Sequence, residues 1–432
     1  MNGDRQQPSI RSSSHPTQQV PSRARGSLRS IQPAHIVGLA GLLGVLAFGV
    51  LAGIRVGAAP AAPTRCPAKK TCQGGSSQSM TTATVTTTTP APSAFVARSG
   101  QQLLLNGAPY RFIGFNMWRA NVASWNQPSN TNYDVNDGTT LASSLTAINA
   151  NGGRQNVIRT WFFQQFALQN GAWNWAAFDK TLQVARQYGF RVIATLVDQW
   201  SYEGPPFLDT SWYQSGYKTR VDAPYDVVPY YQWVRTVVSR YKNDPTILAW
   251  ELVNEPGVSV SETNDSTCGP NPSQTLAAFV HDVGGLIKTI DPNHLVSLGA
   301  SGNGMCGTID GDYQTVMADP SIDLCSFHDY YGPGNQTAYN AWNGLNVRVS
   351  QCATLKKPLY IGEMGMHLDD PLIGGSTAVR ATYLGKKMTA AFAMQGMVGY
   401  VPWQWDSYNH SGDDYNYTVG DPGLAVMTGY AR

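Results

Sequence analysis

Two glutamates stand at the ends of short apolar runs of the sequence. Glu255 follows residues 247–254, and Glu363 ends residues 359–363. A pair of carboxyl groups can divide proton transfer and nucleophilic attack between them when one is protonated and the other is ionised. A nearby guanidinium favours the ionised form, and burial favours the neutral acid. The pair therefore predicts a reaction that needs one acid and one nucleophile or base.

Aromatic and hydrogen-bonding residues follow or end the other apolar runs. They are Arg159, Trp161, Asp198, Trp200, Glu203, Asn254, His328, Asp329, Tyr330, Trp403, Gln404, Trp405 and Asp406. Flat Trp and Tyr rings cover the C–H faces of sugars, while polar neighbours bind the hydroxyls. No C-x2-C pair, H-E-x-x-H motif or phosphate-binding glycine loop occurs, so we expect neither a metal nor a cofactor. This set of residues points to chemistry on sugars.

These residues need a scaffold that gathers strand ends in one place. Eight apolar runs predict strands, at residues 112–116, 156–161, 191–197, 247–254, 295–299, 324–328, 359–363 and 397–403. Helical patterns lie between them, at residues 141–150, 176–188, 229–241, 274–290, 335–353 and 376–395, with a shorter one at 313–317. Eight strand–helix units in about 320 residues predict an α/β fold, a (β/α)8 TIM barrel with parallel strands. An open doubly wound sheet is the alternative, although no G-x-G-x-x-G motif supports it.

The two ends of the barrel sequence give further expectations. Residues 95–98 and 102–105 flank a Ser-Gly turn and predict a small hairpin that closes the barrel floor. Only 29 residues follow Trp403, so we expect the eighth helix to be short or absent.

Four motifs carry a resemblance to a known family. AWELVNEP (residues 249–256) resembles the acid/base motif of glycoside hydrolase family 5, in the retaining (β/α)8 clan, and IGEMG (361–365) resembles its nucleophile motif. IRTW (158–161) and SFHDY (326–330) resemble two further strand motifs of the family. The resemblance covers about residues 103–406 and is strongest to the β-mannanases.

The resemblance implies a role for each motif residue. Glu363 would attack the anomeric carbon, and Glu255 would protonate the leaving oxygen and then activate water. Asn254 would bind the 2-hydroxyl of the substrate, while Arg159 and Tyr330 would hold Glu363 ionised and oriented.

The remaining site candidates are a histidine and several tryptophans. His328 is expected beside the acid/base, with a satisfied core histidine as the alternative. Trp403 would form the platform for the cleaved sugar. Trp118, Trp161 and Trp200 are candidates for further sugar contacts, with packing in the core or rim as an equal alternative for each.

The function implied by the resemblance is a retaining endo-β-1,4-glycanase that acts on β-mannan or glucomannan. Two alternatives stay open. One is a cellulase, another β-glucanase or an exo-acting β-glycosidase on the same scaffold, and the other is a lectin that binds wall polysaccharide. The long loop at 258–272, the segment GFNMWRAN (114–121) and Asp198 depart from the mannanase pattern. Because these segments build the sugar subsites, the polysaccharide is left open.

The first 94 residues differ in composition from the rest. Residues 1–70 hold nine basic residues and only Asp4 among the acids, and they contain the uncharged run 36–54. As a helix of about 1.5 Å per residue, this run approaches the thickness of a bilayer core. We expect a basic cytoplasmic tail (1–35), a transmembrane signal-anchor or signal peptide (36–56), an Ala/Pro/Ser/Thr-rich disordered linker (57–94) and an extracytoplasmic catalytic domain (95–432), either membrane-anchored or secreted.

Charge and cysteine content complete these expectations. The chain has 30 basic and 28 acidic residues, which argues against a nucleic-acid partner. We expect a monomer whose partners are a polysaccharide and, through the N-terminal segment, a membrane. Proximity in sequence favours the disulfides Cys66–Cys72, Cys268–Cys306 and Cys325–Cys352. Sequons occur at Asn264, Asn335, Asn409 and Asn416.

Overall fold

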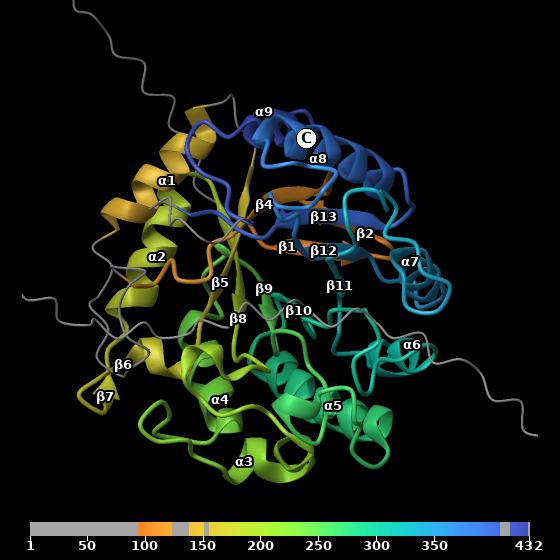
Figure 1. The fold of residues 1–432 in the computed structure, drawn as a ribbon. Coiled ribbons are helices and arrows are strands. Elements are labelled where there is room, and N and C mark those ends of the chain that lie inside the picture. The colour runs from red at the N-terminus through yellow and green to blue at the C-terminus, as the bar shows by residue number, and fades with distance from the viewer. Residues whose placement is uncertain (1–93, 123–137, 151–154, 407–414, 431–432) are drawn as a thin grey trace, which may run out of the picture. The chain divides into compact units, whose positions relative to one another are not determined.

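The structure is a computed structural model that describes residues 94–122, 138–150, 155–406 and 415–430 (Figure 1). The predicted tail, membrane segment and most of the linker, together with the Cys66–Cys72 pair, lie outside the described residues. Within the described ranges, none of the helices combines the length and apolar character needed to cross a bilayer.

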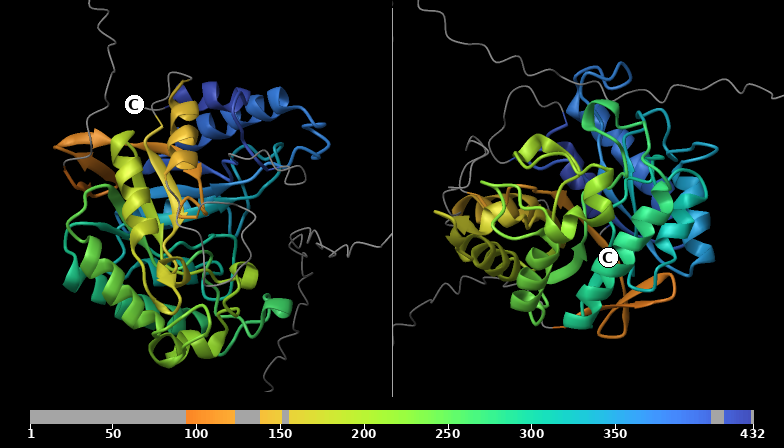
Figure 2. Two further views of the ribbon diagram at one scale, coloured as in Figure 1. Left: turned by 90° about the vertical axis from the view of Figure 1, so that its left-hand side faces the viewer. Right: turned by 90° about the horizontal axis from the view of Figure 1, so that it is seen from below.

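Eight parallel strands form the centre of the fold (Figures 1 and 2). They are β4 (Phe112–Asn116), β5 (Val157–Trp161), β8 (Arg191–Thr195), β9 (Ile247–Glu251), β10 (Leu295–Ser297), β11 (Cys325–Asp329), β12 (Leu359–Met364) and β13 (Met397–Pro402). Their order is β10-β9-β8-β5-β4-β13-β12-β11, and a parallel bridge between Ser297 and Leu324 joins the two ends. This closing bridge confirms the predicted barrel over the open sheet.

Helices surround the strands (Figure 2). They are α1 (Thr139–Ala150), α2 (Ala176–Gln187), α3 (Tyr217–Thr219), α4 (Tyr230–Tyr241), α5 (Pro272–Ile290), α6 (Asp312–Met317), α7 (Leu345–Thr354), α8 (Thr377–Phe392) and α9 (Pro422–Thr428). The seven residues of α9 confirm that the last helix is short.

Several predicted boundaries differ from the observed ones, and two of them lie near the candidate site or the loop that leads from it. Helix α7 begins at Leu345 and not at residue 335, because the side chains of Asn335 and Asn340 bind backbone N–H groups of the preceding segment and hold it in turns. Strand β9 ends at Glu251 and not at Asn254, although an isolated parallel bridge still pairs Asn254 with Asp198. The backbone then takes a left-handed conformation at Glu255.

A small antiparallel sheet closes the floor of the barrel. It contains β1 (Val96–Ser99), β2 (Gln102–Leu105) and β3 (Ala108–Tyr110), so the predicted hairpin is confirmed and gains a third strand. The buried side chains of this sheet belong to one apolar cluster with residues of the barrel strands. The cluster consists of Val96, Leu103, Tyr110, Phe112, Val157, Ile193, Leu248, Ala249, Leu295, Leu324, Tyr360, Val398 and Val401. Apolar contacts therefore seal the end of the barrel where the strands begin.

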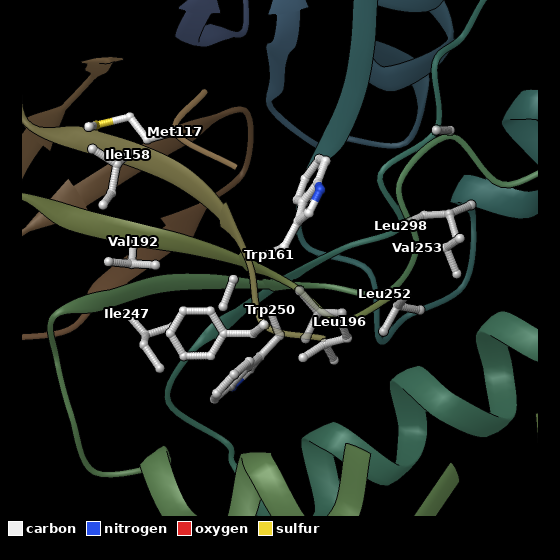
Figure 3. Close-up of a cluster of buried hydrophobic side chains, with 14 of the residues drawn as sticks. Met117, Ile158, Trp161, Val192, Leu196, Ile247, Trp250, Leu252, Val253 and Leu298 are labelled. Atoms are coloured by element: carbon white, nitrogen blue, oxygen red, sulfur yellow. The ribbon is translucent and has the colours of Figure 1, made fainter. Parts of the chain in front are cut away.

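A second apolar layer lies between the strands and the helices (Figure 3). Ile158, Val192 and Trp250 are buried in it. Each such side chain contributes about 1.5–3 kcal/mol of burial free energy. Because successive strand residues face opposite sides, Arg159 and Glu251 lie on the other side of their strands, inside the barrel.

Two of the predicted disulfides are confirmed. Cys268–Cys306 joins the loop after β9 to the loop after β10, and Cys325–Cys352 joins β11 to α7. Disulfides persist in oxidising compartments, which fits the expected extracytoplasmic location.

Candidate active site

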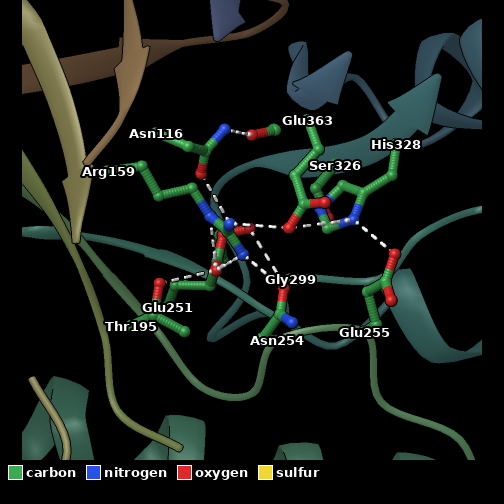
Figure 4. A network of polar contacts seen from close by, with 12 residues as sticks. Asn116, Arg159, Thr195, Glu251, Asn254, Glu255, Gly299, Ser326, His328 and Glu363 are labelled. Atoms are coloured by element: carbon green, nitrogen blue, oxygen red, sulfur yellow. Dashed lines mark hydrogen bonds and ion pairs between the residues drawn. The ribbon is translucent and has the colours of Figure 1, made fainter. Parts of the chain in front are cut away.

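Arg159 is the centre of a buried polar network at the carboxyl ends of the strands (Figure 4). Its Nη2 donates to Glu251 Oε1 at 2.6 Å and to Asn254 Oδ1 at 2.7 Å. Its Nη1 donates to Glu363 Oε1 at 2.9 Å and to Asn116 Oδ1 at 2.8 Å. Burial lowers the pKa of Arg159, but the charges of Glu251 and Glu363 raise it more, so the guanidinium stays charged.

Glu251 is a partner of Arg159 that the sequence analysis did not identify. This fully buried carboxylate also accepts a hydrogen bond from Thr195 Oγ1 at 2.9 Å and one from the Tyr360 hydroxyl. Burial raises the pKa of Glu251, but Arg159 outweighs this effect and the net pKa lies below its usual value. A signal was present, because Glu251 is the one charge within the apolar run ILAWELV, and a charge in a buried strand requires a partner.

Glu363 lies near the end of β12 and is held by two donors. Tyr330 donates its hydroxyl hydrogen to Glu363 Oε2 at 2.7 Å, while Arg159 binds the other oxygen. Gly365 makes room for the tyrosine, since a Cβ at this position would lie 2.3 Å from the Tyr330 ring. The last glycine of IGEMG therefore allows the Tyr330 contact.

Glu255 contacts an indole and an imidazole. Trp200 Nε1 donates to Glu255 Oε2 at 2.9 Å, and His328 Nδ1 lies 2.9 Å from Oε1. The backbone of Glu255 has φ +52°, a left-handed conformation that is rare for a residue with a side chain. This turn lets both Asn254 and Glu255 face the network, as their adjacent positions at a strand end required.

The two carboxyl groups lie close together, with His328 between them. One oxygen of Glu255, one oxygen of Glu363 and a ring nitrogen of His328 are mutually within 4.8 Å, and His328 Nδ1 is 3.6 Å from Glu363 Oε1. These three side chains are metal-ligand types, but the guanidinium of Arg159 beside Glu363 disfavours a second cation there. The arrangement instead suits a carboxyl pair in which the members have different tasks.

The structure distributes the predicted tryptophans over different surroundings. Trp118 and Trp403 are partly buried and stack with ring centroids 6.4 Å apart. Trp161 is buried beneath them, and the Arg159 guanidinium lies 4.8 Å from its ring centroid. Trp405 is buried against Phe115 in the core. Trp118 and Trp403 are therefore the rings with exposed surface, while Trp161 supports them and Trp200 contacts Glu255.

A pocket adjoins the network on the side of Trp200. Trp200 and Asp198 line it, and Asp198 accepts a hydrogen bond of 2.8 Å from Asn254 Nδ2. Gln164 and Asp226, which the sequence analysis did not select, line the same pocket and share a hydrogen bond of 2.9 Å. Burial and the neighbouring Asp222 raise the pKa of Asp226 to about 7.

Comparison with known proteins decides the family. A sequence profile described as GH family 5 beta-mannosidase-like matches residues 175–423. The chain belongs to glycoside hydrolase family 5. This match confirms the predicted enzyme class, a glycoside hydrolase, and the resemblance to the mannanase branch of the family.

Relatives of this family 5 chain carry consistent names. Mannan endo-1,4-beta-mannosidase 4 of Solanum lycopersicum is 29% identical over 68% of this chain and 77% of its own length. Mannan endo-1,4-beta-mannosidase 1 of Oryza sativa is 27% identical over 76% of this chain and 82% of its own. The crystal structure of the endo-1,4-beta-mannanase from Rhizomucor miehei covers 78% of this chain and 98% of its own at a TM-score of 0.60 and 21% identity, which supports the fold.

Proposed function

We propose that this family 5 hydrolase cleaves β-1,4-mannan by a retaining double displacement. The observation that carries the proposal is the pair Glu255 and Glu363, with oxygens within 4.8 Å and different donors on each carboxyl group. Retaining glycosidases place their two carboxyl groups about 5–5.5 Å apart, whereas inverting enzymes leave about 6.5–9.5 Å for a water molecule.

The first chemical step uses both glutamates. A Glu363 oxygen forms a bond to the anomeric carbon while the bond to the leaving oxygen breaks, and Glu255 gives its proton to that oxygen. Arg159 and Tyr330 hold the attacking carboxylate in place through its two oxygens. Trp200 and His328 hold Glu255 toward the bond that breaks.

The second step returns the enzyme to its starting state. Glu255, now ionised, takes a proton from water as the water oxygen attacks the anomeric carbon and Glu363 departs. Asn254 is fixed between Arg159 and Asp198 and offers its amide to the 2-hydroxyl of the sugar. The stacked pair Trp118 and Trp403 supplies apolar ring faces for the sugar.

The choice of mannan rests on the curated relatives, whose names specify mannan endo-1,4-β-mannosidases. The test is an assay of the full-length chain on galactomannan, glucomannan, carboxymethylcellulose and xylan. We expect reducing ends from galactomannan and glucomannan, with retained anomeric configuration by NMR. Release only from carboxymethylcellulose or xylan would replace mannan by another glycan, and silence on every polymer and on aryl β-glycosides would refute the proposal.

We further propose that residues 36–56 carry the catalytic domain out of the cytoplasm, as a retained anchor or a cleaved signal. The basic residues before this run support a cytoplasmic N-terminus. Cell fractionation distinguishes the outcomes: an anchored chain stays in the carbonate-washed membrane pellet, and a cleaved one enters the medium. Recovery in the cytosol would refute both.

A further inference from the structure

The loop between β11 and α7 presents two aromatic side chains to solvent. Tyr339 is 61% exposed and Trp342 is 68% exposed, so most of both rings faces water. Exposing large rings forgoes the burial free energy that aromatic residues usually contribute. Tyr and Trp are enriched at binding interfaces.

The loop holds these rings on an ordered backbone. Asn335 accepts a hydrogen bond from Tyr339 N and donates one to Tyr339 O, both at 2.9 Å. Asn340 Oδ1 accepts from Trp342 N at 2.9 Å and from Asn343 N at 3.0 Å. The rings therefore project from a scaffold that is fixed before any ligand arrives, which lowers the entropy cost of binding.

Neighbouring elements fix the loop at the catalytic end of the barrel. The loop begins beside Tyr330, which binds Glu363. The buried side chain of Lys387 in α8 donates to Asn335 O at 3.1 Å. On the other side, Asn343 Oδ1 accepts from Asp310 N at 2.8 Å, which connects the segment to the loop after β10.

The composition of the loop selects the kind of ligand. The loop residues 330–344 contain no charged side chain, but they contain three asparagines, a glutamine and a threonine. A loop without charged side chains offers no electrostatic attraction to nucleic acids or charged peptides, whereas flat exposed rings can stack on the apolar faces of sugars. The two ring-bearing residues are three positions apart, so their Cα atoms lie at most about 11 Å from each other, a span of a few sugar units.

We propose that Tyr339 and Trp342 form an auxiliary platform that binds a neutral β-glycan chain away from the bond that is cleaved. This proposal rests on the proposed function, because it assigns the polymer substrate as the occupant. The platform holds the polymer near the catalytic pair and raises its local concentration there.

The test separates polymer binding from hydrolysis. The parent is the full-length chain with Glu363→Ala, which blocks turnover, and its mobility is measured in native gels that contain galactomannan, glucomannan, hydroxyethylcellulose or xylan. We expect the added pair Tyr339→Ala and Trp342→Ala to weaken retardation about tenfold. The single variant Trp342→Phe, which keeps a ring at this position and leaves Tyr339 intact, should show most of the retardation of the parent. Val419→Ala, which removes an equally exposed apolar side chain elsewhere, should change nothing.

A second readout uses chains with Glu363 intact. The two alanine substitutions should lower kcat/KM on galactomannan about fivefold more than on an aryl β-mannoside, mainly through KM. Equal retardation of the parent and the double variant, or no retardation of the parent in any gel, would overturn the platform. Loss of the proposed function is recognised separately, as failure of the unmodified chain to hydrolyse mannan.

Discussion

At the scale of residues, the two buried glutamates differ in the groups that surround them. Glu363 contacts a guanidinium and a phenol, whereas Glu255 contacts an indole and an imidazole. The positive charge of Arg159 stabilises a carboxylate at Glu363. This difference supports the attacking role that we propose for Glu363 and the proton-transfer role that we propose for Glu255.

Removing each glutamate should therefore have a different chemical signature. We expect Glu255→Ala to lower kcat on mannan about 100- to 10,000-fold, with a smaller loss on dinitrophenyl β-mannoside, whose leaving group needs no proton. Glu363→Ala should lose activity on both substrates, with rescue by azide. Steady-state kinetics and product NMR check both. Equal losses on the two substrates for Glu255→Ala would contradict the acid assignment.

Glu251 should matter although it lies behind Arg159 and away from the sugar. Glu251→Gln removes one of the two buried carboxylates that pair with Arg159, so we expect a loss of about 3–5 kcal/mol in unfolding free energy. Arg159 would then pair more strongly with Glu363. We expect this stronger pairing to lower kcat more than it raises KM. Denaturant unfolding and kinetics measure the two effects, and Tyr360→Phe, which removes only a hydroxyl, is the milder comparison. Unchanged kcat in a folded Glu251→Gln chain would refute the positioning role.

Sequence motifs located the pair and its direct partners but not the layer behind them. Glu255, Glu363 and Arg159 stand in motifs whose strand positions bring them together. Glu251 and Asn116 were missed, because pairing inside a barrel depends on which strands are neighbours and on their register. The contact between Trp200 and Glu255 was missed for a similar reason, since it joins loops that follow two different strands.

At the scale of elements, the turn after β12 fixes the position of Tyr330. Gly365→Ala would place a methyl group 2.3 Å from the Tyr330 ring. We expect this displacement to lengthen the Tyr330–Glu363 hydrogen bond and to lower kcat, with little loss of helix or strand content by circular dichroism. Gly285→Ala in α5 is the control, because no atom lies within 4 Å of its added Cβ, and it should stabilise the chain by about 0.5–1 kcal/mol. Unchanged kcat for Gly365→Ala would show that the turn does not control Tyr330.

The segment before α4 should respond to pH through Asp226. Because its pKa is raised to about 7, the folded chain holds this proton more tightly than the unfolded chain. The resulting stabilisation is complete below about pH 4 and is lost as the pH rises through about 7. Asp226→Asn keeps an acceptor for Gln164 and removes the charge, so it should raise the melting temperature at pH 8 more than at pH 5. The control Asp369→Asn, in an exposed loop, should shift the melting temperature equally at pH 8 and pH 5. If Asp226→Asn also shifted the melting temperature equally at the two pH values, the effect of burial on the pKa of Asp226 would be contradicted.

Helical periodicity failed where asparagine side chains compete with the helix. The segment before α7 has a helix-like pattern, but Asn335 and Asn340 bond to the backbone locally, so the helix begins at Leu345. Most other predicted elements agree with the observed ones within a few residues, because their apolar period matches a buried face.

At the scale of the whole molecule, the alternation of eight strands and helices was sufficient to predict the barrel. Right-handed crossovers leave few arrangements for such a chain, so the strand order follows from the number of units. The third floor strand was not predicted, since Ala108–Tyr110 is too short to show a period.

The sealed floor has a consequence for salt. Its apolar side chains leave no route from below to Arg159 and Glu251, both of which are inaccessible to solvent. Mobile ions screen charges only where they can come between them. We therefore expect kcat on a neutral aryl mannoside to change less than about twofold between about 0.05 M and about 1 M NaCl. An exposed ion pair such as Lys218–Asp282 should meanwhile lose its contribution to stability. A steep fall in kcat with salt would mean that ions enter the barrel. A constant kcat would describe a catalytic centre that works in brine as well as in fresh water.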